Sequence, residues 1–312
     1  MKHIESSLIT LKAVSPIHAG SGSSTGAVDN PIQRERHTSW PMVQATSFKG
    51  ALRAHCRSQL GAAALADPAS NARNMINWVF GSDSSDYWDE GVKKATFGDI
   101  KEDRQWPENL AGAISVSDLK LLFFPVRSNI APFVYVTSPA VLKRFFGDLT
   151  FLGFEVETVP NVKGECGYWI NKDCGGDRVI LEDAVITPNQ EVIKIEIIRK
   201  RFAGLDRILI VSDDMYDYCV TSCTEIQTQI KIDPKTGTAQ SGALRYEELL
   251  QADSVLYGVI TYNHQVGETL KAKAIKDWLR ENVQNYIQIG GDETLGRGIC
   301  QIQWVEPQGG ES

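Results

Sequence analysis

Several side chains that can carry out acid–base or metal chemistry lie close together near the start of the chain. They are His18, Asp29, Arg34, Glu35 and His37, and a run rich in glycine and serine begins at the first of them. An aspartate with an ordinary pKa near 4 is a poor general base at neutral pH. Asp29 is better suited to bind a hard divalent cation or to orient a nucleophile. Taken singly, each of these residues is more often a loop residue that makes hydrogen bonds.

A second candidate site is the glycine-rich run from Gly290 to Gly298 near the end of the chain. Its spacing superficially matches a phosphate-binding P-loop, but Arg297 replaces the lysine and Gly298 replaces the hydroxyl residue that holds magnesium. A strand, not a helix, is expected after it, which argues against nucleotide hydrolysis. The glycines still allow backbone N–H groups to approach an anion beside Arg297. The alternative is a tight structural turn.

A third feature is a basic stripe on a helix predicted to begin at Ser47 and end at Gly61. Lys49, Arg53 and Arg57 follow one another at intervals of four residues and therefore share one flank. The apolar residues of the same helix have the same spacing and form the face expected to be buried: Phe48, Leu52, Cys56 and Leu60. The stripe can bind phosphates, although an ordinary solvated surface is the alternative.

Composition narrows the class of protein. The 312 residues carry a net charge of −7, with 42% hydrophobic and 23% charged residues, as in globular proteins. No apolar run is long enough to span a membrane, and the first residues do not form a signal peptide, so we expect a cytoplasmic protein without membrane contact. The six cysteines include no C-x-x-C pair, which favours ordinary reduced thiols over a zinc site.

Charge is segregated along the chain. Residues 31 to 57 hold five Lys and Arg against one acidic residue, whereas residues 81 to 108 hold eight acidic residues against four basic ones. One surface can therefore bind a polyanion while another meets a basic neighbour. The acidic total by itself argues weakly against a general nucleic-acid binder.

The order of predicted elements indicates the fold. Strands are expected at 4–14, 114–125, 133–137, 207–211, 254–261 and 299–305, with helices from 47, at 141–146 and at 270–283. The order β-α-β-β-α-β with insertions predicts an α+β, ferredoxin-like (RRM-type) fold. We expect a single domain over 1–312, with an insertion at about 153–190 and a β-hairpin at 225–246. Asp233 to Gly237 supply the turn of that hairpin.

Taken together, an ordered set of segments resembles the RAMP superfamily of CRISPR effector proteins. The segments are H18-A-G-S-G, G26-A-V-D29-N-P-I-Q-R-E, P41-M-V-Q-A-T-S-F-K49-G-A-L-R53, F97-G-D, S117-D-L-K-L-L-F-F-P-V-R-S128, V136-T-S-P-A-V-L-K-R144, I230-K-I-D, T238-A-Q-S-G-A-L-R-Y-E-E and G290-G-D-E-T-L-G-R-G298. They are most similar to the repeated backbone subunit of the type III-B (Cmr) effector complex. The sequence departs from the usual pattern at Thr46 to Phe48 and at Arg245.

That resemblance implies function and site residues. It implies an RRM-like palm, copies of which stack as a filament along a CRISPR RNA beside other Cmr subunits. It also implies that a protruding thumb-like β-hairpin, here about residues 220–246, wedges into the guide–target duplex. It implies endonucleolytic cleavage of target RNA with Mg²⁺ or Mn²⁺, with Asp29 as the essential, metal-binding aspartate and His18 and Glu247 assisting. Lys49, Arg53 and the glycine-rich loop match guide-RNA contacts in the family, and Arg57 lies on the same helix flank as the first two. The loop residues are Gly290, Gly291, Gly296, Arg297 and Gly298.

Two other functions stay open at this point. The first is a guide-RNA-binding scaffold without catalysis, which the presence of Asp29 disfavours. The second is a monomeric ribonuclease that processes precursor RNA through a histidine-centred site without a metal.

Overall fold

The structure is a computed structural model that describes residues 5–22, 24, 26–66, 72–81, 94–97, 100–103, 111–202, 204–263 and 271–305. Most of the acidic segment 81–108 lies outside these residues. Within the described part of the chain, no helix is long and apolar enough to cross a membrane.

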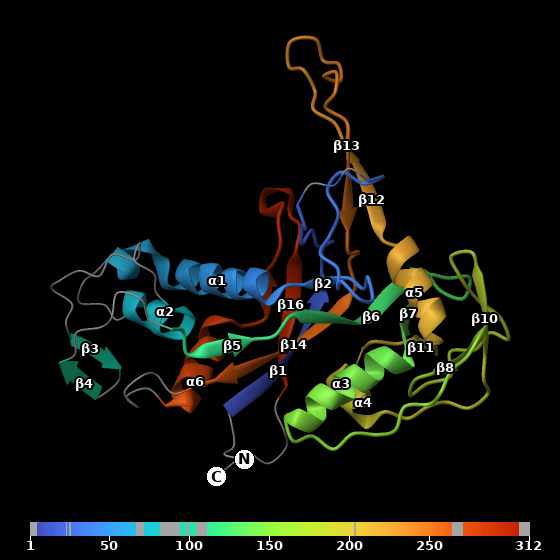
Figure 1. The fold of residues 1–312 in the computed structure, drawn as a ribbon, viewed down its shortest axis with the longest axis horizontal. Helices are drawn as coiled ribbons and strands as arrows, with labels where there is room; N and C mark the ends of the chain where they lie inside the picture. Colours follow the sequence, from blue (N-terminus) through green and yellow to red (C-terminus); the bar gives the residue numbers. More distant parts are fainter. Residues whose placement is uncertain are drawn as a thin grey trace.

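Four antiparallel strands and two helices form the palm (Figure 1). The strands lie side by side in the order β16-β1-β14-β6, and they are the fourth, first, third and second strands of a βαββαβ unit. This arrangement confirms the expected α+β, ferredoxin-like fold. The bounds are β1 (Glu5–Ala13), α1 (Ala45–Ala66), β6 (Leu119–Arg127), β14 (Val255–Tyr262), α6 (Ala272–Asn282) and β16 (Ile299–Val305).

Helix α1 buries the apolar stripe that its sequence predicts. Phe48, Leu52 and Cys56 are completely buried, and α1 contacts both α6 and the β15 edge of the sheet. Gly61 interrupts the helix with a φ of +76°, after which the chain resumes helical turns to residue 66. The helix therefore breaks at the predicted residue but continues beyond it.

The sheet continues beyond β6 through strands that the sequence predicts only in part. β7 (Phe133–Thr137) and β11 (Ile208–Val211) match expectation, whereas β8 (Cys166–Trp169), β9 (Val179–Leu181) and β10 (Ala184–Pro188) lie inside the insertion expected to be irregular. These short strands are separated by glycines and charged turn residues, which hide the pattern. Trp169, Val179 and Leu181 are nevertheless fully buried.

The remaining elements are short or lie beside the sheet. They are β2 (Met42–Val43), α2 (Ala72–Phe80), β3 (Lys94–Phe97), β4 (Ile100–Asp103), β5 (Ile114–Val116), α3 (Pro139–Phe151), α4 (Glu196–Arg201), α5 (Asp213–Ser222), β15 (Tyr286–Gln288) and the 3-10 helix η1 (Glu293–Leu295). Helix α3 is longer than its predicted range because Ser138 caps it and Pro139 occupies its first turn.

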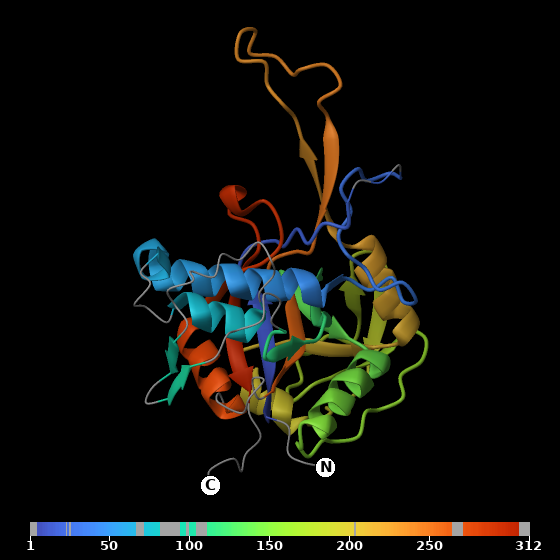
Figure 2. The same ribbon diagram turned by 60° about the vertical axis from the view of Figure 1, so that its left-hand side comes forward.

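A hairpin made of β12 (Glu225–Gln229) and β13 (Arg245–Leu249) projects far from the palm (Figure 1, Figure 2). At its tip, Gly237 donates its N–H to the Asp233 carbonyl and has a φ of +69°. The protruding hairpin and its turn therefore agree with the sequence prediction. The first regular strand, β12, ends at Gln229, whereas the alternating pattern in the sequence continues through Ile230 to Ile232.

The glycine-rich run between β15 and β16 packs tightly against the segment that follows β1. Gly291 donates its N–H to the His18 carbonyl at 2.7 Å, and Gly298 donates to the Pro16 carbonyl at 2.9 Å. A Cβ atom at Gly290 would lie 2.5 Å from the His18 carbonyl oxygen, and one at Gly298 would lie 1.8 Å from the Ile289 carbonyl oxygen. The close approach of these backbones therefore requires glycine at both positions.

We predict that Gly298→Ala disrupts this loop whereas Gly296→Ala is tolerated. Both residues have positive φ, but a Cβ at Gly296 meets no atom within 4 Å. Gly296→Ala should therefore cost about 1–2 kcal/mol for the left-handed backbone, and Gly298→Ala should cost clearly more because the clash is added. Urea unfolding of both variants checks this, and equal losses of stability would contradict it.

Candidate catalytic and metal-binding site

Three segments far apart in the sequence meet where the hairpin joins the palm. The chain after β1 pairs with the end of the hairpin through Ile17 and Leu250, which exchange two backbone hydrogen bonds of 2.7 and 2.9 Å. The same segment accepts the hydrogen bonds from the glycine loop described above. His18, Glu247 and Asp292 are thereby brought together.

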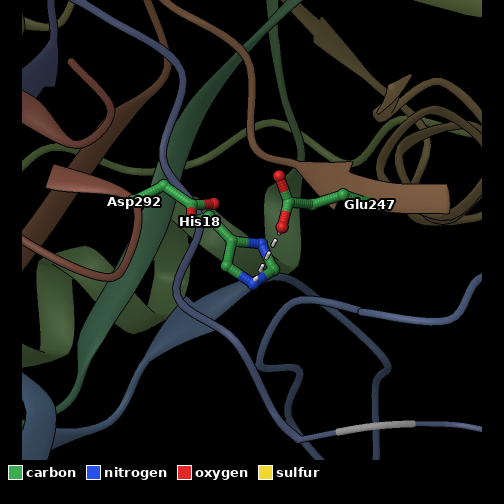
Figure 3. Close-up of side chains that lie close together, drawn as sticks. All are labelled: His18, Glu247 and Asp292. Carbon is green, nitrogen blue, oxygen red and sulfur yellow. Dashed lines mark ion pairs between the residues drawn. The ribbon is translucent and has the colours of Figure 1, made fainter. Parts of the chain in front are cut away.

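These three side chains point toward one another (Figure 3), and their ligand atoms all lie within 4.8 Å of each other. His18 Nε2 is 3.8 Å from Glu247 Oε1. His18 Nδ1 lies 2.9 Å from the Glu248 carbonyl oxygen, which can only accept a hydrogen bond, so Nδ1 carries the proton. In the neutral ring, Nε2 is then unprotonated and faces the carboxylates, as metal-ligating histidines require. The three residues therefore fit a metal ion.

Burial and charge disfavour the ionised form of Glu247. Its side chain is almost completely buried, and Gln229 Nε2 donates to its Oε2. Burial raises the pKa of the Glu247 carboxyl, and repulsion from Asp292 adds to this, whereas the protonated form of His18 and the charge of Arg245 oppose it. A cation between the two carboxylates would relieve both costs.

Asp29 is held beside this cluster by the backbone of β13. Its Oδ2 accepts a hydrogen bond of 2.7 Å from the Tyr246 N–H, and its own N–H donates to the Tyr246 carbonyl. The next residue, Asn30, forms a parallel bridge with Glu247. The structure thus places Asp29, His18 and Glu247 in one region, as the sequence analysis expects. Among the described residues, however, the converging group comprises Asp292 and not Asp29, so metal binding by Asp29 itself stays a prediction.

A buried ion pair fixes the loop that carries Asp29. Glu248 Oε1 accepts hydrogen bonds from Arg34 Nη2 at 2.5 Å and from Thr224 Oγ1 at 2.8 Å, and Oε2 accepts one from the Ile32 N–H. Arg34 also donates to the carbonyls of Ser39 and Val220. Loop 30–34 and strand β13 are therefore held together through the Glu248 carboxylate, and Arg34 also ties them to the Val220 carbonyl on helix α5.

The basic stripe on α1 is partly used within the chain. Lys49 Nζ lies 3.3 Å from the Ile114 carbonyl oxygen, and Arg53 Nη2 lies 3.5 Å from Asn77 Oδ1. Burial lowers the pKa of Lys49, and the neighbouring Arg53 charge adds to the effect. Arg57 is exposed. In the glycine loop, the Arg297 guanidinium donates to Gln227 of the hairpin. Contacts of these residues with RNA stay predictions.

Sequence reasoning did not identify Asp292 or Glu248 as site residues. Asp292 stands inside the quoted glycine-rich motif, and its position directly after two glycines was the available signal. Glu248 follows a candidate residue, but its role depends on a contact with Arg34, which lies more than 200 positions away. No local pattern reports such a contact.

The fold and this site define a RAMP protein: the family model described as "RAMP superfamily" matches residues 10–301, so the chain belongs to that superfamily. Among its relatives is the "CRISPR system Cmr endoribonuclease Cmr4" of Pyrococcus furiosus, which is 34% identical over 96% of this chain and 95% of the relative.

Solved structures agree with this family. The crystal structure of oligomeric Cmr4 from Pyrococcus furiosus has a TM-score of 0.66 and 26% identity, covering 97% of this chain and 98% of that one. A chain in the cryo-EM structure of type III-B Cmr-beta bound to cognate target RNA has a TM-score of 0.70, covering 97% of this chain and 98% of that chain. At 20% identity, the latter likeness shows the fold alone.

We predict that Arg34→Ala destabilises the chain by about 3 kcal/mol, because it leaves the buried Glu248 carboxylate without its cation. Arg36→Ala is the matched control, since Arg36 is exposed on the same loop and surface changes of this kind rarely exceed about 0.5 kcal/mol. Urea unfolding measures both. Equal stability of the two variants would show that the ion pair does not hold the loop.

A second prediction follows from the raised pKa of Glu247. Above that pKa the folded chain bears a buried charge that the unfolded chain hydrates, so Glu247→Gln should stabilise the EDTA-treated protein at neutral pH. The gain should vanish as pH falls through the raised pKa toward the ordinary value of a glutamate, because the folded carboxyl then takes up its proton. Urea midpoints at several pH values, with the exposed Glu281→Gln as control, check this. A pH-independent gain would contradict the assignment.

Proposed function

We propose that this chain is the repeated backbone subunit of a type III-B CRISPR effector complex, which binds CRISPR RNA and cleaves complementary target RNA. One observation carries the proposal. His18 and Glu247, which sit near positions implicated in cleavage within the family, come from distant parts of the sequence and converge at the base of the protruding hairpin, and Asp29, at the family's essential aspartate position, is held beside them by β13. The relative named an endoribonuclease supports the activity.

The residues suit scission of a phosphodiester in RNA. In such a reaction the 2′-hydroxyl attacks the neighbouring phosphorus, the bond to the 5′-oxygen breaks, and a cyclic phosphate and a free 5′-hydroxyl are formed. Asp29, pinned to the Tyr246 N–H, orients the attacking group, and alignment of this kind accelerates such reactions. His18 and Glu247 would hold a divalent cation, Mg²⁺ or Mn²⁺, which supplies charge stabilisation at the phosphate when bound.

RNA binding would use the hairpin, the basic stripe and the glycine loop. The hairpin exposes large apolar side chains that the fold does not bury: Ile226, Ile230, Ile232, Leu244 and Tyr246. Apolar wedges can unstack a base step at a cost of about a few kcal/mol, so we propose that the hairpin interrupts the guide–target duplex. Arg57, with Lys49 and Arg53, and the loop residues Gly290, Gly291, Gly296, Arg297 and Gly298 would contact the guide backbone.

Assembly follows from the same proposal. Copies of the chain would stack head to tail on the CRISPR RNA as a filament, in contact with other Cmr subunits, and the crystal structure of oligomeric Cmr4 supports self-association. We propose that residues 1–312 form one domain, with the 153–190 insertion and the hairpin as parts of it. Its place of action would be the cytoplasm.

The test is Asp29→Asn in the fully assembled complex. The substitution keeps the shape of the side chain and removes its charge, so cleavage of target RNA should fall by about 10²-fold or more while guide and target affinity stay within twofold. Asp214→Asn, an exposed aspartate on α5, is the matched control and should cleave at the wild-type rate.

Other outcomes would favour the alternatives. Wild-type assembly on RNA without any cleavage, with either metal present, would favour a scaffold subunit. Cleavage of precursor repeat RNA by the isolated chain in EDTA would favour the processing ribonuclease. Undiminished cleavage by Asp29→Asn would remove Asp29 from the mechanism.

A further inference from the structure

The structure of its own loop does not explain the side chain of Asp292. Its backbone is left-handed, with a φ of +56°, although it is not glycine. It precedes η1, yet its side chain makes no capping hydrogen bond there. Its Oδ2 is buried and has no hydrogen-bond partner among the described residues. A buried carboxylate oxygen without a donor is costly, so this arrangement calls for a missing partner.

The neighbours of Asp292 identify what that partner must be. The groups that converge with it are the buried Glu247 carboxylate and His18 Nε2, which is an acceptor in the neutral ring because Nδ1 faces the Glu248 carbonyl. Three acceptors can be satisfied together by a cation, whereas a single shared proton serves only two of them. An added Cβ at Gly20 would lie 2.9 Å from His18 Nε2, so the glycine keeps that nitrogen clear.

The surrounding backbone holds the three groups in place without any RNA. Gly291 is hydrogen-bonded to the His18 carbonyl, and Gln288 Nε2 donates to the carbonyls of Gly290 and Arg297 on either side of the loop. The glycine loop therefore does more than form a surface for an anion. It positions Asp292 next to His18, in the segment after β1, and next to Glu247, on β13.

We propose that Asp292 is the third protein ligand of a preformed divalent-cation site with His18 and Glu247, and that the site takes Mn²⁺ in preference to Mg²⁺. Mg²⁺ demands near-ideal octahedral oxygen ligands and gives up water reluctantly, whereas Mn²⁺ binds carboxylates as Mg²⁺ does and, as a first-row transition-metal ion, also binds sites that include a nitrogen ligand. The contribution of this site to RNA cleavage rests on the function proposed above, but its occupancy does not.

The test is a titration of the full-length, RNA-free, EDTA-dialysed chain with Mn²⁺, followed by electron paramagnetic resonance. The wild type should bind a single Mn²⁺ whose pulsed spectrum shows coupling to the ¹⁴N of His18, lost in His18→Gln. Asp292→Asn should weaken Mn²⁺ binding by at least about tenfold, a loss that removal of an outer-shell partner alone can cause. Glu293→Gln, the exposed neighbour, should bind as the wild type does. Displacing the Mn²⁺ should take a large molar excess of Mg²⁺.

Each contrary result overturns part or all of the proposal. Equal affinity of Asp292→Asn and wild type removes Asp292 from the site, and displacement by equimolar Mg²⁺ refutes the preference. Failure of the wild type to bind Mn²⁺ refutes the site, while cleavage that depends on Asp29 in the assembled complex would leave the proposed function standing. Conversely, if Mn²⁺ binding depends on Asp292 but the assembled complex cuts no RNA, the proposed function is contradicted and the proposed metal site is supported.

Discussion

The arrangement of the whole site depends on one property of a β-strand, which is that consecutive side chains point to opposite faces. Glu247 and Glu248 are consecutive residues of β13, and both are buried. Glu248 faces Arg34 and anchors the loop that carries Asp29, while Glu247 faces His18 and Asp292. A shift of one residue in the register of this strand would move both carboxylates to the opposite faces, away from their present partners.

The two buried carboxylates are compensated in different ways. Glu248 has a guanidinium, a hydroxyl and a backbone N–H, so its charge is satisfied inside the chain. Glu247 has one amide donor and a second carboxylate nearby, which leaves its charge incompletely balanced. Perturbed groups of this kind mark functional sites because a fold that only needed stability would pair or remove them. The imbalance at Glu247 therefore supports this cluster as the candidate site, whereas the charge of Glu248 is balanced by its own partners.

Local sequence patterns predicted the elements of the palm and only part of the site. The spacing of Phe48, Leu52 and Cys56 predicted the buried face of α1, and the turn residues from Asp233 predicted the hairpin, because both depend on neighbouring residues alone. The short strands β8 to β10 were missed although they pair largely with one another, because glycines and charged turn residues break the alternation over so few residues. The clustering of His18 with Glu247 was available only through family resemblance. The roles of Asp292 and Arg34 were not identified, because they arise from contacts across the fold, and the only local signal was the position of Asp292 directly after two glycines.

The geometry of β13 also links binding to cleavage under the proposed function. Tyr246 exposes its side chain on the projecting hairpin, its backbone holds Asp29, and Glu247 follows immediately in the buried cluster. Adjacent Cα atoms in a strand are only about 3.3 Å apart along its axis, so the residue that meets the duplex and the residues that act on the phosphate move as one rigid unit. Each subunit then cuts at a fixed offset from its own hairpin. The spacing between cuts is set by the repeat of the filament, not by the sequence of the target, which is the behaviour required of an enzyme that takes its sequence specificity from a guide RNA.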